Sequence, residues 1–229
     1  MEIRLQNGYD TYNFVDAKEG NVISIQSSGI KKVLSNLKDD YSPSYISHDQ
    51  NYFVGNTVLN EIDLYCRSFD ISVVEDVMNC LSLDLEFLNR EINTLSYTEK
   101  IYLNIIRNIA LSNNIVVFDD VFKYLDYANQ KKIKLLLNYL KENLFVIFVT
   151  SKDIDVLYEI SDYSIIWNKK VFKYDTTDNI YTNVEFLKKH RFKIPTLSYI
   201  TYRAKVDKNV KLFYSKDVRD IIKDIYKHV

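Results

Sequence analysis

Apolar residues follow two different spacings in the second half of this 229-residue chain. Short runs that are apolar throughout are typical of strands buried on both faces of a parallel sheet. Between these runs, apolar residues recur at intervals of three and four, which is typical of amphipathic helices. The alternation predicts βαβ units and a parallel sheet. The predicted strands are 115–118, 144–150 and 164–167, with helices at 131–141 and 153–160 and a hairpin return at 168–174.

The first half of the chain has a different organisation. Segments 3–6 and 21–26 have the character of strands, and 31–38 has that of a short helix. From residue 58 to 94 the apolar spacing is helical in three consecutive segments. A longer helix is expected at 98–111, where four isoleucines share one face.

Composition and charge exclude few classes of protein. With 47% hydrophobic and 27% charged residues the chain is expected to be globular. Thirty basic against thirty-one acidic residues give a formal charge of −1, so no overall field draws it to nucleic acid or membrane. The glycine count of four matters more, because phosphate-binding loops depend on glycine.

The expected location is cytoplasmic, with attachment to the cytoplasmic membrane face only through a partner. No stretch approaches the roughly 18–20 apolar residues of a membrane span, and the first ten residues lack a signal peptide's apolar core. Cys66 and Cys80 are too few for a disulfide framework, so reduced thiols are expected.

Polar residues follow two of the predicted strands at the point where each strand ends. Asp119 and Asp120 come directly after the first strand, and Thr150 and Ser151 end the next. Ligands of α/β sheets gather at the carboxyl ends of the strands. Two interpretations of the acidic pair stay open: a magnesium and phosphate site, or a solvated turn.

The order of these motifs resembles the ATP-binding cassette (ABC) ATPase family over roughly residues 20–175. The segment LSYTEKIYLNIIRNIAL, with Leu95, Ser96, Glu99 and Arg107, is similar to the family's LSGGQ signature and the helix that follows it. IVVFDD resembles the Walker B strand, and Leu125-Asp126 resembles the D-loop. Residues 49–65 resemble the segment after the Q-loop in ATPases of energy-coupling-factor importers.

The resemblance implies a fold and a set of roles. The fold would be α/β, a P-loop NTPase-like core with a mainly parallel sheet, a helical subdomain at about 58–95 and a small C-terminal appendage. Asp119 would orient magnesium, Asp120 would stand in place of the catalytic Glu, and Ser151 would replace the switch histidine. Ser47 would stand at the Q-loop position, and Ser96, Glu99 and Asp126 would contribute to nucleotide contacts.

The phosphate loop departs from the family pattern. Where a glycine-rich loop ending in Gly-Lys-Ser/Thr is expected, the chain has QSSGIKKVL, with Gly29 alone and fewer residues. Such a loop aims successive backbone N–H groups at the phosphates and places a Lys on them. Lys31 or Lys32 is left as the candidate for that charge, and the loop is expected to be broken.

The other positions of the resemblance are altered as well. Tyr97 and Thr98 replace the signature glycines, where a partner's γ-phosphate would press against the backbone. Asp120 is one methylene shorter than Glu and would hold an attacking water badly, and Ser151 cannot act as an imidazole. Together these changes point to a degenerate ATPase.

Several candidates also have purely local explanations. Ser96 and Glu99 make a capping box before an apolar helix, and Asp126 is suited to cap the next helix. Lys31 and Lys32 fit a solvated helical face. The stretch from Lys188 to Lys211, which has eight basic residues and one acid, is expected to be a solvated, partner-facing surface. The expected domains are 1–184 and a basic appendage, 185–229.

Three functional hypotheses follow. The first is a pseudo-ATPase, not an enzyme, that pairs with another ABC ATPase subunit as a homodimer or heterodimer, or with a membrane transporter subunit. The second is a slow ATPase with a divergent loop, using ATP and Mg²⁺ with Asp119 at the metal. The third is a nucleic-acid-associated ABC-type protein. It ranks last because the chain shows no sustained heptads for coiled-coil arms.

Overall fold

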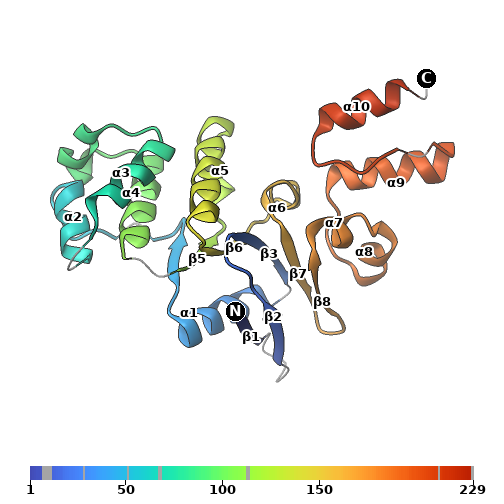
Figure 1. Cartoon of the computed structure of the whole chain (residues 1–229), viewed down its shortest axis with the longest axis horizontal. Coiled ribbons are helices and arrows are strands. Elements are labelled where there is room, and N and C mark those ends of the chain that lie inside the picture. Colours follow the sequence, from blue (N-terminus) through green and yellow to red (C-terminus); the bar gives the residue numbers. More distant parts are fainter. Residues whose placement is uncertain are drawn as a thin grey trace.

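A six-stranded, mainly parallel sheet forms the centre of the protein. The computed structural model describes residues 1–6, 12–27, 29–50, 52–66, 69–111, 114–210 and 212–227. Helices cover both faces of the sheet, a group of helices lies at one end, and a second group extends at the C-terminus (Figure 1). The predicted α/β class with a parallel sheet is confirmed.

The strand order of the sheet is β4-β5-β6-β3-β7-β8. Neighbouring strands are parallel up to β7, and β8 returns antiparallel as the predicted hairpin. The strands are β3 (Asn21–Ser27), β4 (Ser44–Ser47), β5 (Ile115–Asp119), β6 (Val146–Thr150), β7 (Tyr163–Trp167) and β8 (Phe172–Thr176). A separate antiparallel pair is formed by β1 (Glu2–Gln6) and β2 (Tyr12–Asp16).

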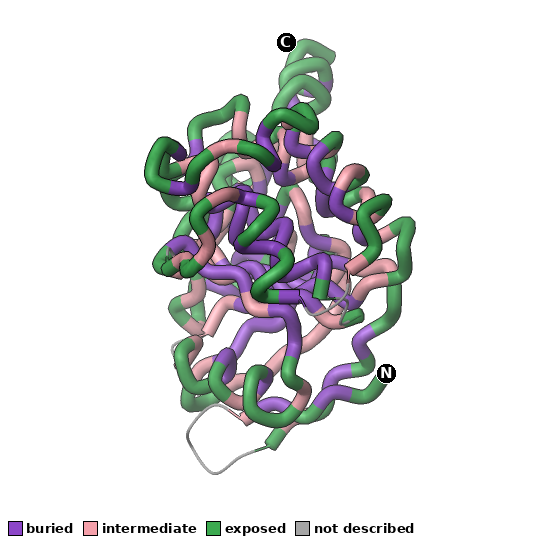
Figure 2. Tube along the Cα trace, turned by 90° about the vertical axis from the view of Figure 1, so that its left-hand side faces the viewer, coloured by how far each residue is buried: buried purple, intermediate pink, exposed green. Residues whose placement is uncertain are grey.

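Alternate residues of the buried strands serve two different cores. Val116 and Phe118 of β5 join the large cluster under α4 (Tyr97–Ala110) and α5 (Tyr127–Glu142). Val117 points the other way, to the cluster under α1 (Ile30–Tyr41) and the β1-β2 pair. The strands are therefore apolar throughout because both faces are covered. In Figure 2 the buried residues concentrate in this central region, whereas the C-terminal helix is mainly exposed.

The helical region before β5 is confirmed except for one segment. Helices α2 (Val58–Tyr65) and α3 (Ile71–Cys80) pack on α4, as the apolar spacing predicted. The third predicted helical segment is instead two 3-10 turns, Leu85–Asn89 and Ile92–Thr94. The first turn is tight because the N–H of Phe87 bonds back three residues, to the carbonyl and carboxylate oxygens of Asp84.

Helix α6 (Ile154–Ile160) connects β6 to β7. The C-terminal part, after β8, is a series of helices: α7 (Thr177–Tyr181), α8 (Val184–His190), α9 (Thr196–Lys208) and α10 (Val218–Tyr226). Position 185, the predicted boundary of the appendage, falls inside α8, whose Leu187 packs in one cluster with Ile166 and Tyr181. The division into two domains stays a prediction.

Candidate nucleotide site at the strand ends

The carboxyl ends of β4, β5 and β6 meet at one edge of the sheet. Ser47 is the register partner of Asp119, and Asp119 is that of Thr150. A cavity of about 460 Å³ lies at this edge, and α1 and the end of β3 form its other side. The residues that line it include Gln26, Ser27, Lys31, His48, Asp49, Asp119, Asp120, Lys123, Thr150, Ser151, Lys152 and Lys193.

Asp119 lies in this cavity with both carboxylate oxygens engaged. The hydroxyl of Thr150 donates to Oδ1 at 2.7 Å, and the phenol of Tyr45 donates to Oδ2. Burial, and then the hydrogen bond to Asp119, raise the pKa of Tyr45 far above its ordinary value. The two donors are therefore neutral hydroxyls from the strands on either side of β5.

Asp120 and Ser151 close the turns that follow their strands. Asp120 has a left-handed backbone (φ 52°), its N–H donates to Thr150, and its Oδ1 accepts the N–H of Lys152 at 3.2 Å. The hydroxyl of Ser151 accepts the N–H of Asp153 at 3.1 Å. Both predicted residues reach the cavity. The hydrogen bond of Ser151 is local, whereas those of Asp120 tie the end of β5 to the end of β6.

The connection between β3 and α1 is short. The strand ends at Ser27 and the helix begins at Ile30, so residues 28 and 29 alone separate them, and Ser28 lies outside the described residues. The N–H of Gly29 donates to the hydroxyl of Ser27 at 3.0 Å. Lys31 and Lys32 are exposed in the first turn of α1, as expected for a solvated face, although Lys31 also lines the cavity.

The strand-end residues do not fit magnesium-bound ATP in this arrangement. A P-loop of about eight residues normally supplies N–H groups, a lysine and a hydroxyl that holds the metal. Two residues stand in place of the roughly six that precede the Lys of a P-loop, and the first turn of α1 has Ile30 and two lysines where a hydroxyl is required. The oxygens of Asp119 accept protein hydroxyls. Among the described residues no cluster of three His, Cys, Asp or Glu could hold a metal ion.

The signature position is built as a helix cap. The hydroxyl of Ser96 accepts the N–H of Glu99 at 3.3 Å, and the N–H of Ser96 donates to the Glu99 carboxylate at 2.8 Å. Burial opposes ionisation of Glu99, but the bonds from Ser96 and Arg90 outweigh it and lower the pKa of Glu99. The capping box is confirmed.

Tyr97, which stands in place of a signature glycine, contacts residues of its own chain beside the strand ends. Its hydroxyl donates to the carbonyl of His48 at 3.1 Å. Its ring meets that of Tyr124 edge-on, with centroids 5.7 Å apart, and Tyr124 also contacts the ring of His48. Side chains thus join the start of α4 to the ends of β4 and β5.

The other predicted site residues cap or complete local structure. Asp126 begins α5, and its Oδ1 accepts the N–H of Asn129 at 2.8 Å. Ser47 is buried at the end of β4, where its hydroxyl accepts the N–H of Asp49 and its carbonyl accepts the amide of Asn104. The predicted cap at Asp126 is confirmed.

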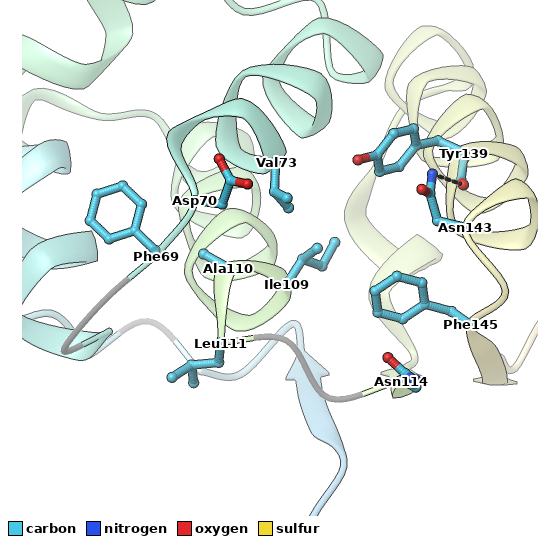
Figure 3. Close-up of a pocket in the computed structure, with 10 residues that line it drawn as sticks. All are labelled: Phe69, Asp70, Val73, Ile109, Ala110, Leu111, Asn114, Tyr139, Asn143 and Phe145. Carbon is cyan, nitrogen blue, oxygen red and sulfur yellow. Dashed lines mark hydrogen bonds between the residues drawn. The ribbon is translucent and has the colours of Figure 1, made fainter.

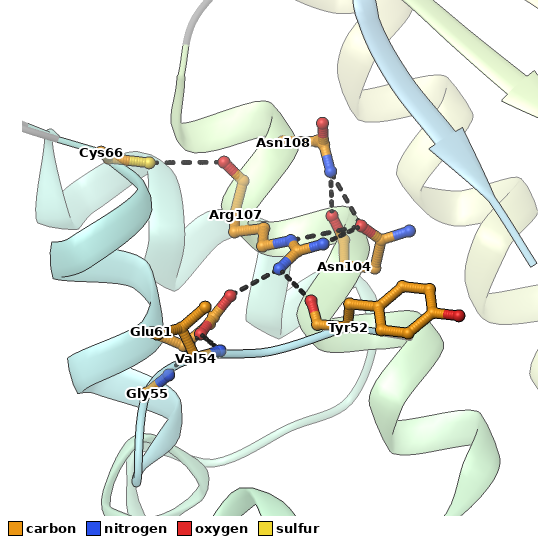
Figure 4. A network of polar contacts seen from close by, with 8 residues as sticks. All are labelled: Tyr52, Val54, Gly55, Glu61, Cys66, Asn104, Arg107 and Asn108. Atoms are coloured by element: carbon orange, nitrogen blue, oxygen red, sulfur yellow. Dashed lines mark hydrogen bonds and ion pairs between the residues drawn. The ribbon is translucent and has the colours of Figure 1, made fainter. Parts of the chain in front are cut away.

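The stretch 49–65 is held to α4 by a buried ion pair (Figure 4). Arg107 binds Glu61, and their side chains are 8% and 3% exposed. The guanidinium also donates to the carbonyl of Tyr52 at 3.0 Å, and the second oxygen of Glu61 accepts the N–H groups of Val54 and Gly55 at 2.8 and 2.7 Å. Every charged group of the pair is therefore compensated.

Lys193, from the segment after α8, reaches the strand ends. Its backbone N–H donates to the side chain of Gln26 at 3.0 Å, and its ammonium donates to the carbonyl of Lys152. Elsewhere in the basic stretch, Lys188 lies over the rings of Tyr199 and Tyr202, at 5.1 and 4.3 Å. Two aromatic residues of this stretch, Tyr199 and Tyr202, therefore contact a lysine of the same chain. Lys211 lies outside the described residues.

A second cavity, of about 680 Å³, lies between α3, the ends of α4 and α5, and the start of β5 (Figure 3). Asn114 and Phe145 line it, just before β5 and β6, so it lies at the opposite edge of the sheet from Asp119. Two lining side chains form hydrogen bonds within the chain: Tyr139 donates to Asp76, and Asn143 donates to the carbonyl of Tyr139.

No helix in the described part of the chain has the length and apolarity to cross a bilayer.

Sequence reasoning missed Tyr45 and Lys193. Tyr45 had a signal, because it lies two residues before Ser47 in a strand and so shares the face of that residue. Lys193 had none, because it is distant in sequence from Gln26 and Lys152, and nothing local indicates the contact.

Comparison with known proteins shows what the chain is similar to. No protein-family model matches the chain. It is 30% identical over 89 residues to the energy-coupling factor transporter ATP-binding protein EcfA of Carboxydothermus hydrogenoformans, covering 39% of this chain and 33% of that protein. With EcfA of Aster yellows witches'-broom phytoplasma it is 20% identical over 179 residues, covering 76% and 65%. The matches span less than two thirds of these relatives' lengths.

Solved structures agree on the fold. The structure of cbiO1 from Clostridium perfringens, part of the ABC transporter complex cbiONQ, matches 87% of this chain and 98% of its own with a TM-score of 0.65 and 13% identity. A dimeric bacterial ABC transporter cassette matches 77% and 99%, with a TM-score of 0.58 and 18% identity. The resemblance to ABC ATPases is confirmed, and the chain has the fold of an ATP-binding cassette.

Proposed function

We propose that the chain is a degenerate ABC transporter subunit, a pseudo-ATPase that acts as a structural or regulatory partner of an active ABC subunit or a membrane transporter. The observation that carries the proposal is the connection from β3 to α1, where two residues stand in place of the roughly six that precede the Lys and Ser/Thr of a P-loop. A backbone this short has too few N–H groups to surround a triphosphate.

The features at the other motifs support the same proposal. The hydroxyls of Tyr45 and Thr150 engage Asp119, and Tyr97 fills a position where the family has glycine. By contrast, the Arg107–Glu61 pair holds the segment that, by resemblance, leads toward a membrane partner. A chain that keeps this region and loses its phosphate loop is suited to assembly rather than hydrolysis.

Titration calorimetry of the purified chain with Mg-ATP, and then with a non-hydrolysable analogue, tests the proposal. We expect no saturable binding up to about 1 mM nucleotide, a limit of roughly −4 kcal/mol. An active ABC cassette titrated in the same buffer is the positive control. Saturable binding well below that concentration would overturn the proposal.

A slow ATPase with a divergent loop is the second candidate, and the strand-end cavity favours it. Lys31, Lys123, Lys152 and Lys193 line that cavity, and together they offer charge for an anionic ligand. This candidate requires Mg-ATP binding and a turnover that Asp119→Asn abolishes. Turnover that is equal in the wild type and in Asp119→Asn would come from a contaminant and would reject it.

The partner is proposed to be another ABC subunit, a second copy of this chain or a membrane component. The similar cbiO1 is part of an ABC transporter complex, and the similar bacterial cassette is dimeric. Sedimentation of the purified chain with and without Mg-ATP separates the cases. A nucleotide-independent dimer supports self-association, and a monomer directs the search to a different subunit. The matches to cbiO1 and to the bacterial cassette include nearly the whole length of each of those two proteins.

A further inference from the structure

Three adjacent parallel strands place their side chains around one carboxylate. Thr150 is the register partner of Asp119 on β6, and Tyr45 lies on β4, opposite Val117. Residues two apart on a strand share a face, so Tyr45 lies on the same face as Ser47, the partner of Asp119. The long phenol side chain spans the offset and reaches the Asp119 carboxylate.

The hydroxyl of Tyr45 donates its hydrogen bond to one oxygen of the Asp119 carboxylate, and the hydroxyl of Thr150 donates to the other. A protonated hydroxyl points its hydrogen at the carboxylate oxygen, where a cation would have to approach. Mg²⁺ in proteins binds through one or two carboxylates and keeps several waters, so it needs free oxygen surface on the carboxylate.

We propose that Tyr45 closes the metal position of the strand-end site, because its hydroxyl holds the Asp119 oxygen that a divalent cation would need. The site is then occupied by the chain's own side chains rather than by a metal. The inference rests on the proposed function, since a closed metal position is a feature of a pseudo-ATPase, but it concerns a single residue.

The hydroxyl group that shares the metal with this carboxylate in a P-loop has no counterpart at the start of α1. In a P-loop the hydroxyl of the Ser/Thr after the Lys shares the metal with the Walker B carboxylate. Here α1 begins Ile30-Lys31-Lys32, without a hydroxyl, and the hydroxyls that reach Asp119 come from β4 and β6. The carboxylate of Asp119 is therefore hydrogen-bonded by side chains of the two neighbouring strands, at the oxygens that a metal and a loop hydroxyl would contact in a P-loop.

The test is Mn²⁺ binding by the full chain, followed through the paramagnetic resonance signal of free Mn²⁺. We expect Tyr45→Phe to bind Mn²⁺ at least about tenfold more tightly than the wild type. The double variant Tyr45→Phe with Asp119→Asn should lose that gain. A gain that survives in the double variant, or a wild type that binds as tightly as Tyr45→Phe, would overturn the inference.

Tyr102→Phe is the matched control. Its hydroxyl is also a buried donor, to the side chain of Asn129 at 2.7 Å, but it lies between α4 and α5. Removing it should leave Mn²⁺ binding at the wild-type level. If Tyr45→Phe does not fold, as judged by circular dichroism, Tyr45→Met removes the same hydroxyl with an adaptable side chain. Failure of either folded variant to gain Mn²⁺ rejects the inference.

The outcome is separable from that of the proposed function. Mg-ATP binding by the wild type would reject the pseudo-ATPase, whatever Mn²⁺ alone does in the variants. Conversely, an absence of nucleotide binding together with equal Mn²⁺ binding in the wild type and Tyr45→Phe would reject the role of Tyr45 alone.

Discussion

Two carboxylates of this protein are enclosed in different ways. Glu61 is 3% exposed and faces a guanidinium and two backbone N–H groups, so its charge meets an opposite charge. Asp119 accepts two neutral hydroxyls at the edge of a cavity. A buried ion pair is costly to break from one side, whereas a carboxylate held by hydroxyls can lose a donor at moderate cost. The first arrangement holds segments together, and the second lies at the edge of an open cavity.

Removing the cation of the helical network should have the largest effect. Arg107→Met leaves Glu61 buried without its partner, which should lower the free energy of unfolding by about 3–5 kcal/mol. Urea denaturation measures this loss. The control is Arg203→Met, which removes an exposed ion pair with Asp207 and should leave the urea midpoint unchanged. Equal midpoints for the two variants would contradict the comparison.

A side chain at Gly55, in the same network, should lower the stability of the protein. A Cβ added there would lie 2.5 Å from the backbone nitrogen of Glu61, so the chain must shift. Gly55→Ala should lower the free energy of unfolding by about 1–3 kcal/mol. The exposed neighbour Asn56 provides the control, because Asn56→Ala adds no contact. A Gly55→Ala protein as stable as Asn56→Ala would show that the segment adapts.

Asp119→Asn should cost less than either change in the helical network. One carboxylate oxygen becomes an amide that faces a hydroxyl, and we expect a loss of about 1 kcal/mol in the free energy of unfolding. Asp126→Asn is the matched control, since Asn is as good a helix N-cap as Asp. A loss of several kcal/mol at Asp119 would mean that the strand-end site is as important to the fold as the ion pair.

High pH should produce the smallest and broadest effect. Burial is the first cause that raises the pKa of Tyr102, Tyr139, Tyr174 and Tyr181 to about 12. In the unfolded chain these phenols ionise near pH 10. The stability from protonated phenols is therefore full below about pH 10 and is lost as the pH rises toward 12.

Ultraviolet titration of tyrosinate checks this sign. The native protein should show a delayed group of phenols, and urea midpoints should fall between about pH 10 and 12. Tyr181→Phe should remove part of that pH dependence, because Tyr181 is fully buried. A single titration near the ordinary value for all the tyrosines would contradict the assignment.

Local patterns predicted most of the elements. The apolar runs became β5, β6 and β7, and the Ser96–Glu99 capping box was confirmed because all its bonds lie within four residues. The segment after Asp84 was wrong in type, because a side-chain cap and a tight turn prevailed over its apolar spacing. Periodicity counts apolar positions and cannot tell a 3-10 turn from an α-helix.

The sequence predicted where the candidate site lies but not which side chains form hydrogen bonds there. Asp119, Asp120 and Ser151 lie at the strand ends because a parallel sheet brings its carboxyl ends together. Sequence spacing also indicated that the loop before α1 is short. The spacing from Ser47 indicated only the face of the strand on which Tyr45 lies. Its bond to Asp119 depends on the register between two strands separated by the whole helical region.

The sequence by itself determined where most of the strands and helices of the central sheet lie and that the connection before α1 is short, because these depend on residues close together in the chain. The tertiary structure alone decided which groups meet at the strand ends. Tyr45, Thr150 and Lys193 reach the strand ends from separate segments. Their contacts arise only when sheet register and the return of the C-terminal segment bring distant residues within hydrogen-bonding distance.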